Sequence, residues 1–123
     1  MEALVVTFKT HASQEQFTAA TAENAPVFAE VDGLVAKIWI ADSESGTYGG
    51  IYLFGDRTAL DAYLESDLFE SILAEPSFEG TSWRRYHVLD ELTARTQPGI
   101  QIVGDAFGGR RSRTQSPLPS TAR

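Results

Sequence analysis

The stretch GLVAKIWIADSESGTYGGIYLF, residues 33–54, decides the fold of this 123-residue chain. It predicts two strands joined by a polar loop at residues 42–46, because apolar and aromatic side chains dominate on both sides of that loop. Side chains of a strand alternate between the faces of a sheet. One face of the first strand would then carry Leu34, Ala36, Ile38 and Ile40, and the other Val35, Lys37 and Trp39. A sheet with one face in water would show polar side chains at every second position, so both faces are expected to be covered.

The remaining elements complete a βαββαβ order. We expect a strand at residues 2–9, a helix from Ser13 to about Glu30 that breaks before Pro26, two short helices or one bent helix at 57–74, and a strand at 81–89. This is the ferredoxin-like split arrangement, an α+β fold with helices on one face of a four-stranded antiparallel sheet. An apolar face left uncovered is unusual for a monomer, so a homodimer packed sheet against sheet is expected.

The chain is expected to form one domain at residues 1–100, followed by a largely disordered tail at residues 101–123. The sequence Gln-Pro-Gly at residues 97–99 ends the regular pattern, and the chain from residue 104 onward is rich in Gly, Arg, Ser, Thr and Pro. The apolar residues between 100 and 103 could pair as a short edge strand or exchange onto a partner subunit.

Composition and charge exclude several classes of function. The net charge is -7, with -10 in residues 1–96 and +3 in residues 97–123, so the folded part is too acidic for a general nucleic-acid binder. The absence of cysteine excludes a disulfide scaffold and a thiolate metal site, and it fits a reducing compartment. The N-terminus lacks a signal-peptide pattern, and no stretch approaches the roughly 18 apolar residues of a membrane span. A cytoplasmic protein without a membrane partner is expected.

Four aromatic residues, Trp39, Tyr48, Tyr52 and Tyr63, are candidates for a pocket that holds a flat aromatic ligand between sheet and helices. The alternative is that they are ordinary core residues. Whether Trp39 and Tyr52 share a face depends on the register of the hairpin, which the sequence leaves open. Lys37 alternates onto the face of Trp39, where its ammonium would either bind an acidic or phenolate oxygen or extend past apolar neighbours into solvent.

His87 and Arg85 are candidate catalytic residues, because they lie two positions apart on one face of the last strand. A histidine can take the proton from a phenol, and an arginine can hold the resulting anion. The alternative is a surface or interface pair. No metal site is expected, because His11 and His87 are too far apart in sequence to form a recognised metal motif.

Residues 37–54, KIWIADSESGTYGGIYLF, with DAYLES at residues 61–66 and LTARTQPGI at residues 92–100, resemble the YdhR-type mono-oxygenase family. The resemblance covers about residues 4–100 and is most specific in GGIYLF, residues 49–54. It implies the ferredoxin-like fold and the dimeric α/β barrel of the superfamily to which this family belongs. It also implies oxidation of electron-rich phenolic or polycyclic aromatic substrates by oxygen with no bound metal or flavin, although other relatives degrade haem.

The sequence thus predicts a mono-oxygenase that needs no cofactor and acts on a small aromatic, phenolic or quinol-type molecule. The expected general base is His87, the expected anion holder is Arg85 or Lys37, and the expected walls are Trp39, Tyr48, Tyr52 and Tyr63. A non-catalytic dimeric protein that binds a hydrophobic small molecule is the alternative. Haem binding is a third interpretation, and it would require an axial ligand that faces the pocket.

Overall fold

The computed structural model of the chain describes the backbone of residues 1–105 and the side chains of residues 1–97. Two units are distinct, residues 1–88 and residues 89 onward. The elements of the first unit are, in order, β1 (Glu2–Lys9), α1 (Gln14–Ala22), α2 (Ala25–Ala29), β2 (Leu34–Asp42), β3 (Thr47–Phe54), α3 (Arg57–Leu64), α4 (Asp67–Ala74) and β4 (Glu79–His87).

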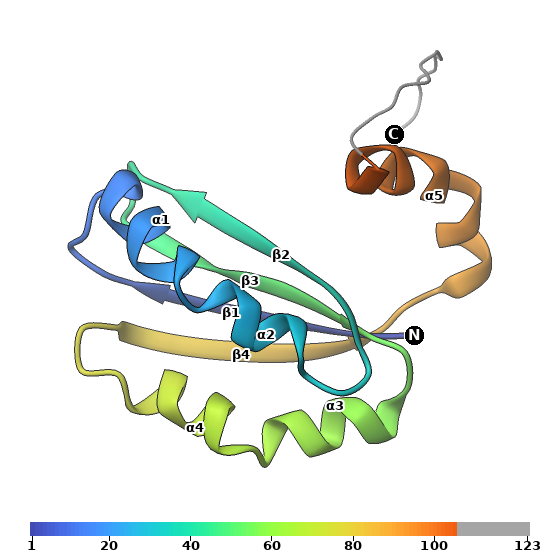
Figure 1. The fold of residues 1–123 in the computed structure, drawn as a ribbon, viewed down its shortest axis with the longest axis horizontal. Coiled ribbons are helices and arrows are strands. Elements are labelled where there is room, and N and C mark those ends of the chain that lie inside the picture. Colours follow the sequence, from blue (N-terminus) through green and yellow to red (C-terminus); the bar gives the residue numbers. More distant parts are fainter. Residues whose placement is uncertain (106–123) are drawn as a thin grey trace. The chain divides into compact units, whose positions relative to one another are not determined.

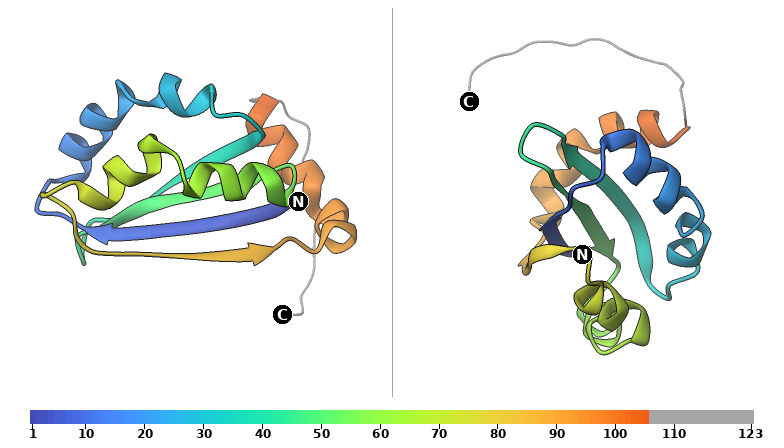
Figure 2. Two further views of the ribbon diagram at one scale, coloured as in Figure 1. Left: turned by 90° about the horizontal axis from the view of Figure 1, so that it is seen from below. Right: turned by 90° about the vertical axis from the view of Figure 1, so that its left-hand side faces the viewer.

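The four strands form one antiparallel sheet in the order β2-β3-β1-β4. The helices α1 to α4 lie on one face of that sheet (Figures 1 and 2). This arrangement confirms the predicted ferredoxin-like α+β fold. The last strand begins and ends two residues earlier than the sequence indicated.

Capping residues explain where the helices begin. Ser13 and Gln16 form a capping box, in which Gln16 Oε1 accepts from the Ser13 amide at 2.9 Å and Ser13 Oγ accepts from the Gln16 amide at 3.1 Å. Asp56 and Ser66 cap α3 and α4 more simply, each with one side-chain oxygen that accepts from a backbone amide of the first turn. Pro26 stands in the first turn of α2, so the expected break after α1 is confirmed as a boundary between two helices.

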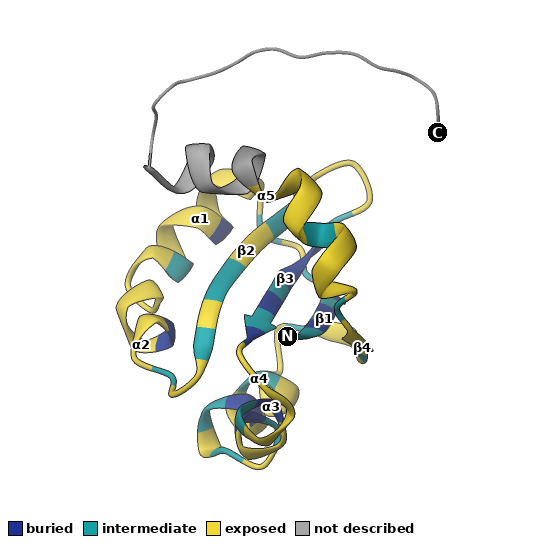
Figure 3. Cartoon of the chain, turned by 90° about the vertical axis from the view of Figure 1, so that its right-hand side faces the viewer, coloured by how far each residue is buried: buried dark blue, intermediate teal, exposed yellow. Residues whose placement is uncertain are grey.

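The core lies between the sheet and the helices (Figure 3). Its buried side chains come from alternate positions of β1 and β3 and from the inner faces of the helices, and they are Leu4, Val6, Phe8, Tyr48, Tyr52, Phe54, Phe17, Phe28, Leu60, Tyr63 and Phe69. Each large apolar side chain removed from water stabilises the fold by about 1.5–3 kcal/mol. The outer strands β2 and β4 contribute no fully buried residue.

A β-bulge near the start of β2 changes the expected alternation. Leu34 is opposite Phe54, but the register shifts between Leu34 and Ala36, so that Lys37 is opposite Tyr52. Directly opposed residues of an antiparallel pair lie on the same face. The predicted grouping of Leu34 with Ala36 is therefore wrong, because the extra residue at the bulge turns Leu34 toward the helices.

The other face of the sheet is not covered by α1 to α4 (Figure 2). It carries apolar side chains, including Ile38 opposite Ile51, and Tyr86 opposite Ala3. Ile38 is 42% exposed and Tyr86 is 50% exposed. This surface is the one that the sequence assigned to a partner subunit.

The second unit contains one helix among its described residues, α5 (Asp90–Asp105). The short edge strand considered for residues 100–103 is therefore wrong, since the backbone there is helical. The predicted disordered tail falls mainly on residues 106–123, which lie outside the described residues. Among the residues that are described, no helix is both long and apolar enough to span a membrane.

Candidate functional site

A cavity of about 190 Å³ lies between the sheet and the helices α1, α2 and α4. Strands β1, β2 and β3 form its floor. Aromatic rings supply most of its wall, namely Phe8, Phe17, Phe28, Trp39, Tyr52 and Phe78. Its polar side chains are Thr21, Asn24, Lys37, Ser71 and Glu75. Concave, mainly apolar sites with a few polar groups are typical of small-molecule binding.

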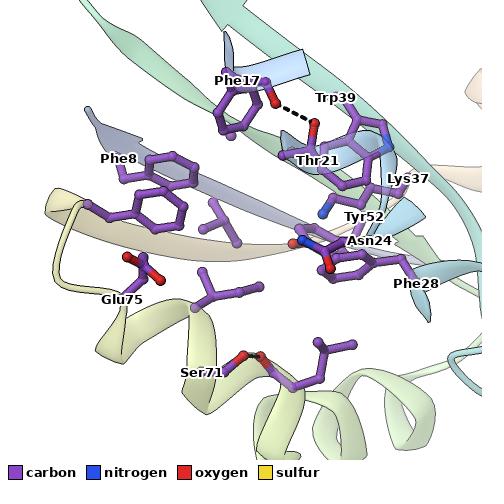
Figure 4. Close-up of a pocket in the computed structure, with 16 residues that line it drawn as sticks. Phe8, Phe17, Thr21, Asn24, Phe28, Lys37, Trp39, Tyr52, Ser71 and Glu75 are labelled. Atoms are coloured by element: carbon purple, nitrogen blue, oxygen red, sulfur yellow. Dashed lines mark hydrogen bonds between the residues drawn. The ribbon is translucent and has the colours of Figure 1, made fainter. Parts of the chain in front are cut away.

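Lys37 is the cationic side chain of this cavity, and aromatic rings surround its amine (Figure 4). The Nζ atom lies 3.4 Å from the ring centroid of Phe28, 3.5 Å from that of Trp39 and 4.6 Å from that of Tyr52. Ring faces attract an ammonium ion by about 0.5–2 kcal/mol each. Removal from water acts in the opposite direction, and burial lowers the pKa of Lys37 from 10.5 to about 7.

The amine of Lys37 has no counterion among the residues whose side chains the structure describes. Among the described residues, Lys37 has neither a hydrogen-bond acceptor nor a carboxylate partner. Glu75 lines the same cavity, but its carboxylate accepts from the amide and the hydroxyl of Ser77 at 3.1 and 2.8 Å. Because its pKa is about 7, Lys37 is present in both its amine and its ammonium forms at neutral pH. A ligand could supply the acceptor that its ammonium form lacks.

The other polar groups differ in how far they are free to bind a ligand. The hydroxyls of Thr21 and Ser71 donate to the backbone carbonyls of Phe17 and Leu68 at 2.8 and 2.6 Å. Asn24 immediately precedes α2, yet its side chain makes no capping hydrogen bond. Figure 4 shows Asn24 beside the cavity with its carboxamide toward the interior. Asn24 is thus the uncharged side chain best placed to contact a ligand near Lys37.

Gly50 makes room for the lysine side chain. A Cβ atom at this position would lie 2.8 Å from Cε of Lys37 and 3.3 Å from a ring carbon of Tyr52. Both contacts are shorter than ordinary van der Waals separation. Glycine inside a strand often marks the close approach of another group, and here Gly50 accommodates the lysine stem.

The register of the β2–β3 hairpin shows that Trp39 and Tyr52 lie on the same face of the sheet. Trp39 is opposite Gly50 and Lys37 is opposite Tyr52, so all four positions face the helices. Trp39 and Tyr52 thus line one cavity, together with Lys37. The ring of Phe28 stands edge-on to both, with centroids 5.5 Å from Trp39 and 6.1 Å from Tyr52.

The two remaining aromatic candidates are not among the residues that line the cavity. Tyr48 is buried, and its hydroxyl donates to the carbonyl of Ala12 at 3.0 Å. Tyr63 packs against Tyr52 and Phe69 with centroid separations of 5.2 and 5.3 Å. Burial raises the pKa of Tyr63, and the nearby Tyr52 hydroxyl raises it further. The Tyr63 hydroxyl is buried, and among the described residues it makes no hydrogen bond of good geometry.

His87 and Arg85 also lie outside the residues that line the cavity. The side chain of His87 is 71% exposed, and its Nδ1 lies 2.8 Å from Oε2 of Glu2 on the adjacent strand. Arg85 donates through Nη2 to Oδ1 of Asp61 at 2.7 Å. Each of these groups already has a carboxylate partner, and the structure does not bring them to the aromatic wall.

Sequence reasoning missed the roles of Asn24 and Phe28. Both belong to a stripe with Phe17 and Thr21, whose members recur every three or four residues, as on one face of an amphipathic helix. The signal that could have identified a site is that two members of this stripe are polar. A stripe that faces a filled core is normally apolar, so its polar members are the ones that line a cavity.

The described residues contain no group of three His, Cys, Asp or Glu side chains that could hold a metal ion. Neither histidine lines the cavity, and His11 is exposed with Nε2 3.7 Å from Oε2 of Glu79. Neither histidine could therefore serve as an axial ligand for a haem in this cavity.

Comparison with known proteins identifies one matching family model, described as "Putative mono-oxygenase ydhR", which matches residues 3–98. Curated protein sequences give no match. Among solved structures, the cofactor-independent oxygenase SnoaB from Streptomyces nogalater is similar, with 19% identity, a TM-score of 0.57, and coverage of 72% of this chain and 92% of that one.

Two further structures have the same fold. The NE2512 protein of unknown function from Nitrosomonas europaea shares 21% identity over 72% of this chain and 88% of that chain, with a TM-score of 0.58. A protein described as a putative antibiotic biosynthesis monooxygenase from Deinococcus radiodurans shares 15% identity over 72% of this chain and 92% of that chain, with a TM-score of 0.57.

Proposed function

The chain belongs to the ydhR family of mono-oxygenase-type proteins, and from this membership and the cavity we propose that it is an oxygenase for a single-ring phenol or quinol that needs no bound cofactor. One observation carries the proposal. Lys37 places its amine inside an aromatic cavity with no carboxylate partner from residues 1–97, where it can take a phenol proton and hold the resulting anion.

The size and lining of the cavity support a single-ring substrate. Pockets for drug-sized ligands usually measure about 300–1,000 Å³, whereas this cavity is about 190 Å³. A flat ring can contact the faces or edges of Phe28, Trp39 and Tyr52, an arrangement that aromatic groups favour. The free carboxamide of Asn24 can accept from or donate to a second ring oxygen.

The proton step follows from the state of Lys37. Because its pKa is about 7, a large share of the side chain is neutral at physiological pH and can act as a base. Proton transfer from the phenol produces an ammonium ion that lies between aromatic rings and beside the phenolate. The phenolate thus becomes the counterion of the Lys37 ammonium, which has none among the described residues.

The oxygen step can be written with balanced atoms and electrons. A phenolate transfers one electron to O₂, and the resulting phenoxyl radical and superoxide combine to form a C–O bond at a ring carbon. Loss of water from this peroxide gives a quinone, so that a phenol and O₂ yield a quinone and H₂O. The substrate supplies all four electrons, and the role of the protein is to ionise and orient it.

Oxygen consumption by a panel of phenols and quinols, corrected for autoxidation, tests this proposal. General-base catalysis contributes about 10²–10⁴-fold to a rate, so Lys37→Met should lose turnover by at least about a hundredfold. His87→Ala and Lys9→Met should retain the parent rate, because neither residue lines the cavity. Equal turnover by Lys37→Met and the parent, or loss of turnover only in His87→Ala, would contradict the assignment.

A non-catalytic binding protein is the second candidate. The hydroxyls of Thr21 and Ser71 are already bound to backbone carbonyls, which leaves few groups for chemistry. Tryptophan fluorescence can report binding in a Trp83→Phe background, since Trp39 lines the cavity and Trp83, the other tryptophan, does not. Quenching by phenols without oxygen consumption across the panel would favour this candidate over the oxygenase.

We also propose that the uncovered face of the sheet packs against the same face of a second copy. Ile38 and Ile51 are opposite each other near the middle of β2 and β3, and an apolar surface of this kind is typical of an interface. Light scattering of the purified protein should give twice the chain mass of 13.4 kDa, and Ile38→Lys should give the monomer mass. A monomeric parent would contradict the dimer.

A further inference from the structure

We propose that Lys37 is also a nucleophilic amine that condenses with a small aromatic aldehyde to form a Schiff base. This reaction goes beyond the proposed oxygenation, because it requires neither oxygen nor a substrate that can be oxidised. It would make the cavity a covalent carbonyl-binding site.

The surroundings of Lys37 meet the requirements for such an amine. Lysines that form Schiff bases are typically held in apolar pockets, where the neutral form is favoured over the ammonium ion. Lys37 has the rings of Phe28 and Trp39 within 3.5 Å of Nζ, and among the described residues no carboxylate is paired with it. An ion pair would hold the ammonium form, so its absence leaves the nitrogen lone pair available.

The ionisable neighbours of Lys37 do not oppose its neutral amine form. The cavity contains two other ionisable side chains, Tyr52 and Glu75. Burial raises the pKa of Tyr52 to about 12, so its hydroxyl is uncharged at neutral pH. Glu75 is held by two hydrogen bonds from Ser77 on the far side of the cavity, where Figure 4 places it beyond Phe8 and away from the lysine.

The same geometry selects an aromatic aldehyde over an aliphatic one. The amine is at the wall of a cavity whose lining is mainly aromatic, so a ring held there brings its carbonyl carbon to Nζ. The cavity of about 190 Å³ suits one ring with small substituents. Asn24, whose side chain makes no capping hydrogen bond, can donate to the carbonyl oxygen as it becomes an alkoxide.

The reaction is balanced without a redox partner. The nitrogen lone pair of Lys37 attacks the carbonyl carbon, a C–N bond forms, and the C=O π electrons move to oxygen. Transfer of a proton from nitrogen to oxygen gives the carbinolamine. Loss of water then gives the imine, so that one amine and one aldehyde yield one imine and one H₂O.

Reductive trapping provides a direct test, because the chain contains only two lysines, Lys9 and Lys37. We would incubate the full-length protein under nitrogen at pH 8 with 4-methoxybenzaldehyde and sodium cyanoborohydride. Intact mass and peptide mapping then locate the reduced adduct. This aldehyde has no phenol hydroxyl and oxygen is excluded, so the result does not depend on turnover as an oxygenase.

We expect at least tenfold more adduct on Lys37 than on Lys9 or on the N-terminal amine, because the exposed Lys9 has no enclosing aromatic site. The preference should disappear in urea and with acetaldehyde as the probe. Lys9→Met should retain the adduct and Lys37→Arg should lose it while keeping the circular dichroism spectrum of the parent.

Equal labelling of the three amines in the folded protein, or labelling that spares Lys37, would overturn the inference. If Lys37 is not trapped but phenol-dependent oxygen consumption persists, the Schiff-base inference fails and the oxygenase proposal stands. If Lys37 is trapped and no phenol is oxidised, the Schiff-base inference stands and the oxygenase proposal fails.

Discussion

Replacement of Lys37 by methionine should change the stability of the protein in a way that depends on pH. The pKa of Lys37 is about 7 in the folded chain, against an ordinary value of 10.5 that we assign to the unfolded chain. Between these two values the unfolded chain binds more protons than the folded chain. Stability therefore rises with pH across this window, and the penalty for burying the lysine is largest at and below pH 7.

The linkage relation gives the magnitude. For these two values, the penalty is about 4 kcal/mol at pH 7 and about 2 kcal/mol at pH 9, a change of about 2 kcal/mol. This change is an upper value, because Lys37 is partly exposed and water screens part of the penalty. Methionine has a similar stem, carries no charge and packs well against aromatic rings. The Lys37→Met protein should thus be more stable than the parent at pH 7, and its advantage should shrink by pH 9.

Urea denaturation of parent and variant at pH 7, 8 and 9 measures this difference directly, since groups common to both proteins cancel. Lys9→Met is the matched control, and its difference from the parent should stay within about 0.5 kcal/mol, as for most exposed substitutions. A Lys37→Met advantage that changes by less than about 0.5 kcal/mol between pH 7 and pH 9 would refute the reasoning. So would an advantage that grows with pH.

Three other predictions concern packing and the interior hydroxyls. Tyr63→Phe should be neutral or raise the unfolding free energy by up to about 1 kcal/mol, because it removes a buried hydroxyl without a hydrogen-bond partner among the described residues. Tyr48→Phe should lower it by about 1 kcal/mol, because that hydroxyl donates to a backbone carbonyl at 3.0 Å, and urea denaturation of both variants checks the opposite signs. Gly50→Ala should cost about 1–3 kcal/mol and weaken quenching of Trp39 by phenols, since the new methyl group would lie 2.8 Å from Lys37 Cε. Unchanged stability and quenching in Gly50→Ala would show that the lysine stem moves freely.

Most of the fold was readable from the sequence because each element carries its own local signal. The capping box at Ser13 set the start of α1, and Pro26 set the boundary between α1 and α2. The bulge at the start of β2 was not readable, because it is fixed by how β2 pairs with β3 and not by a local residue pattern. A single extra residue there reverses the face of Leu34 relative to Ala36.

The candidate site was only partly readable, for the same reason. Trp39, Tyr52 and Lys37 were candidates from the sequence and line one cavity in the structure, but whether they faced one another depended on the strand register. His87 and Arg85 were chosen because their chemistry suits a base and an anion holder. Their carboxylate partners, Glu2 and Asp61, come from distant parts of the chain, so no local sequence pattern indicates these pairs.

The C-terminal segment shows where local signals mislead. A Gln-Pro-Gly sequence normally interrupts a helix, and the apolar residues after it favoured a strand. The backbone nevertheless remains helical from Asp90 to Asp105. The acidic residues Asp90 and Glu91 in the first turn complement the helix dipole and favour its start, which is a signal that the strand interpretation overlooked.

The wall formed by α1 and α2 links occupancy of the cavity to local motion. Each of these helices contributes a single buried side chain, Phe17 from α1 and Phe28 from α2, and both rings line the cavity. Segments with few buried apolar contacts open locally at a low free-energy cost. A molecule in the cavity would contact the same two rings and so stabilise the closed wall. Amide hydrogen exchange in residues 14–29 should therefore become slower as the fraction of occupied cavities rises.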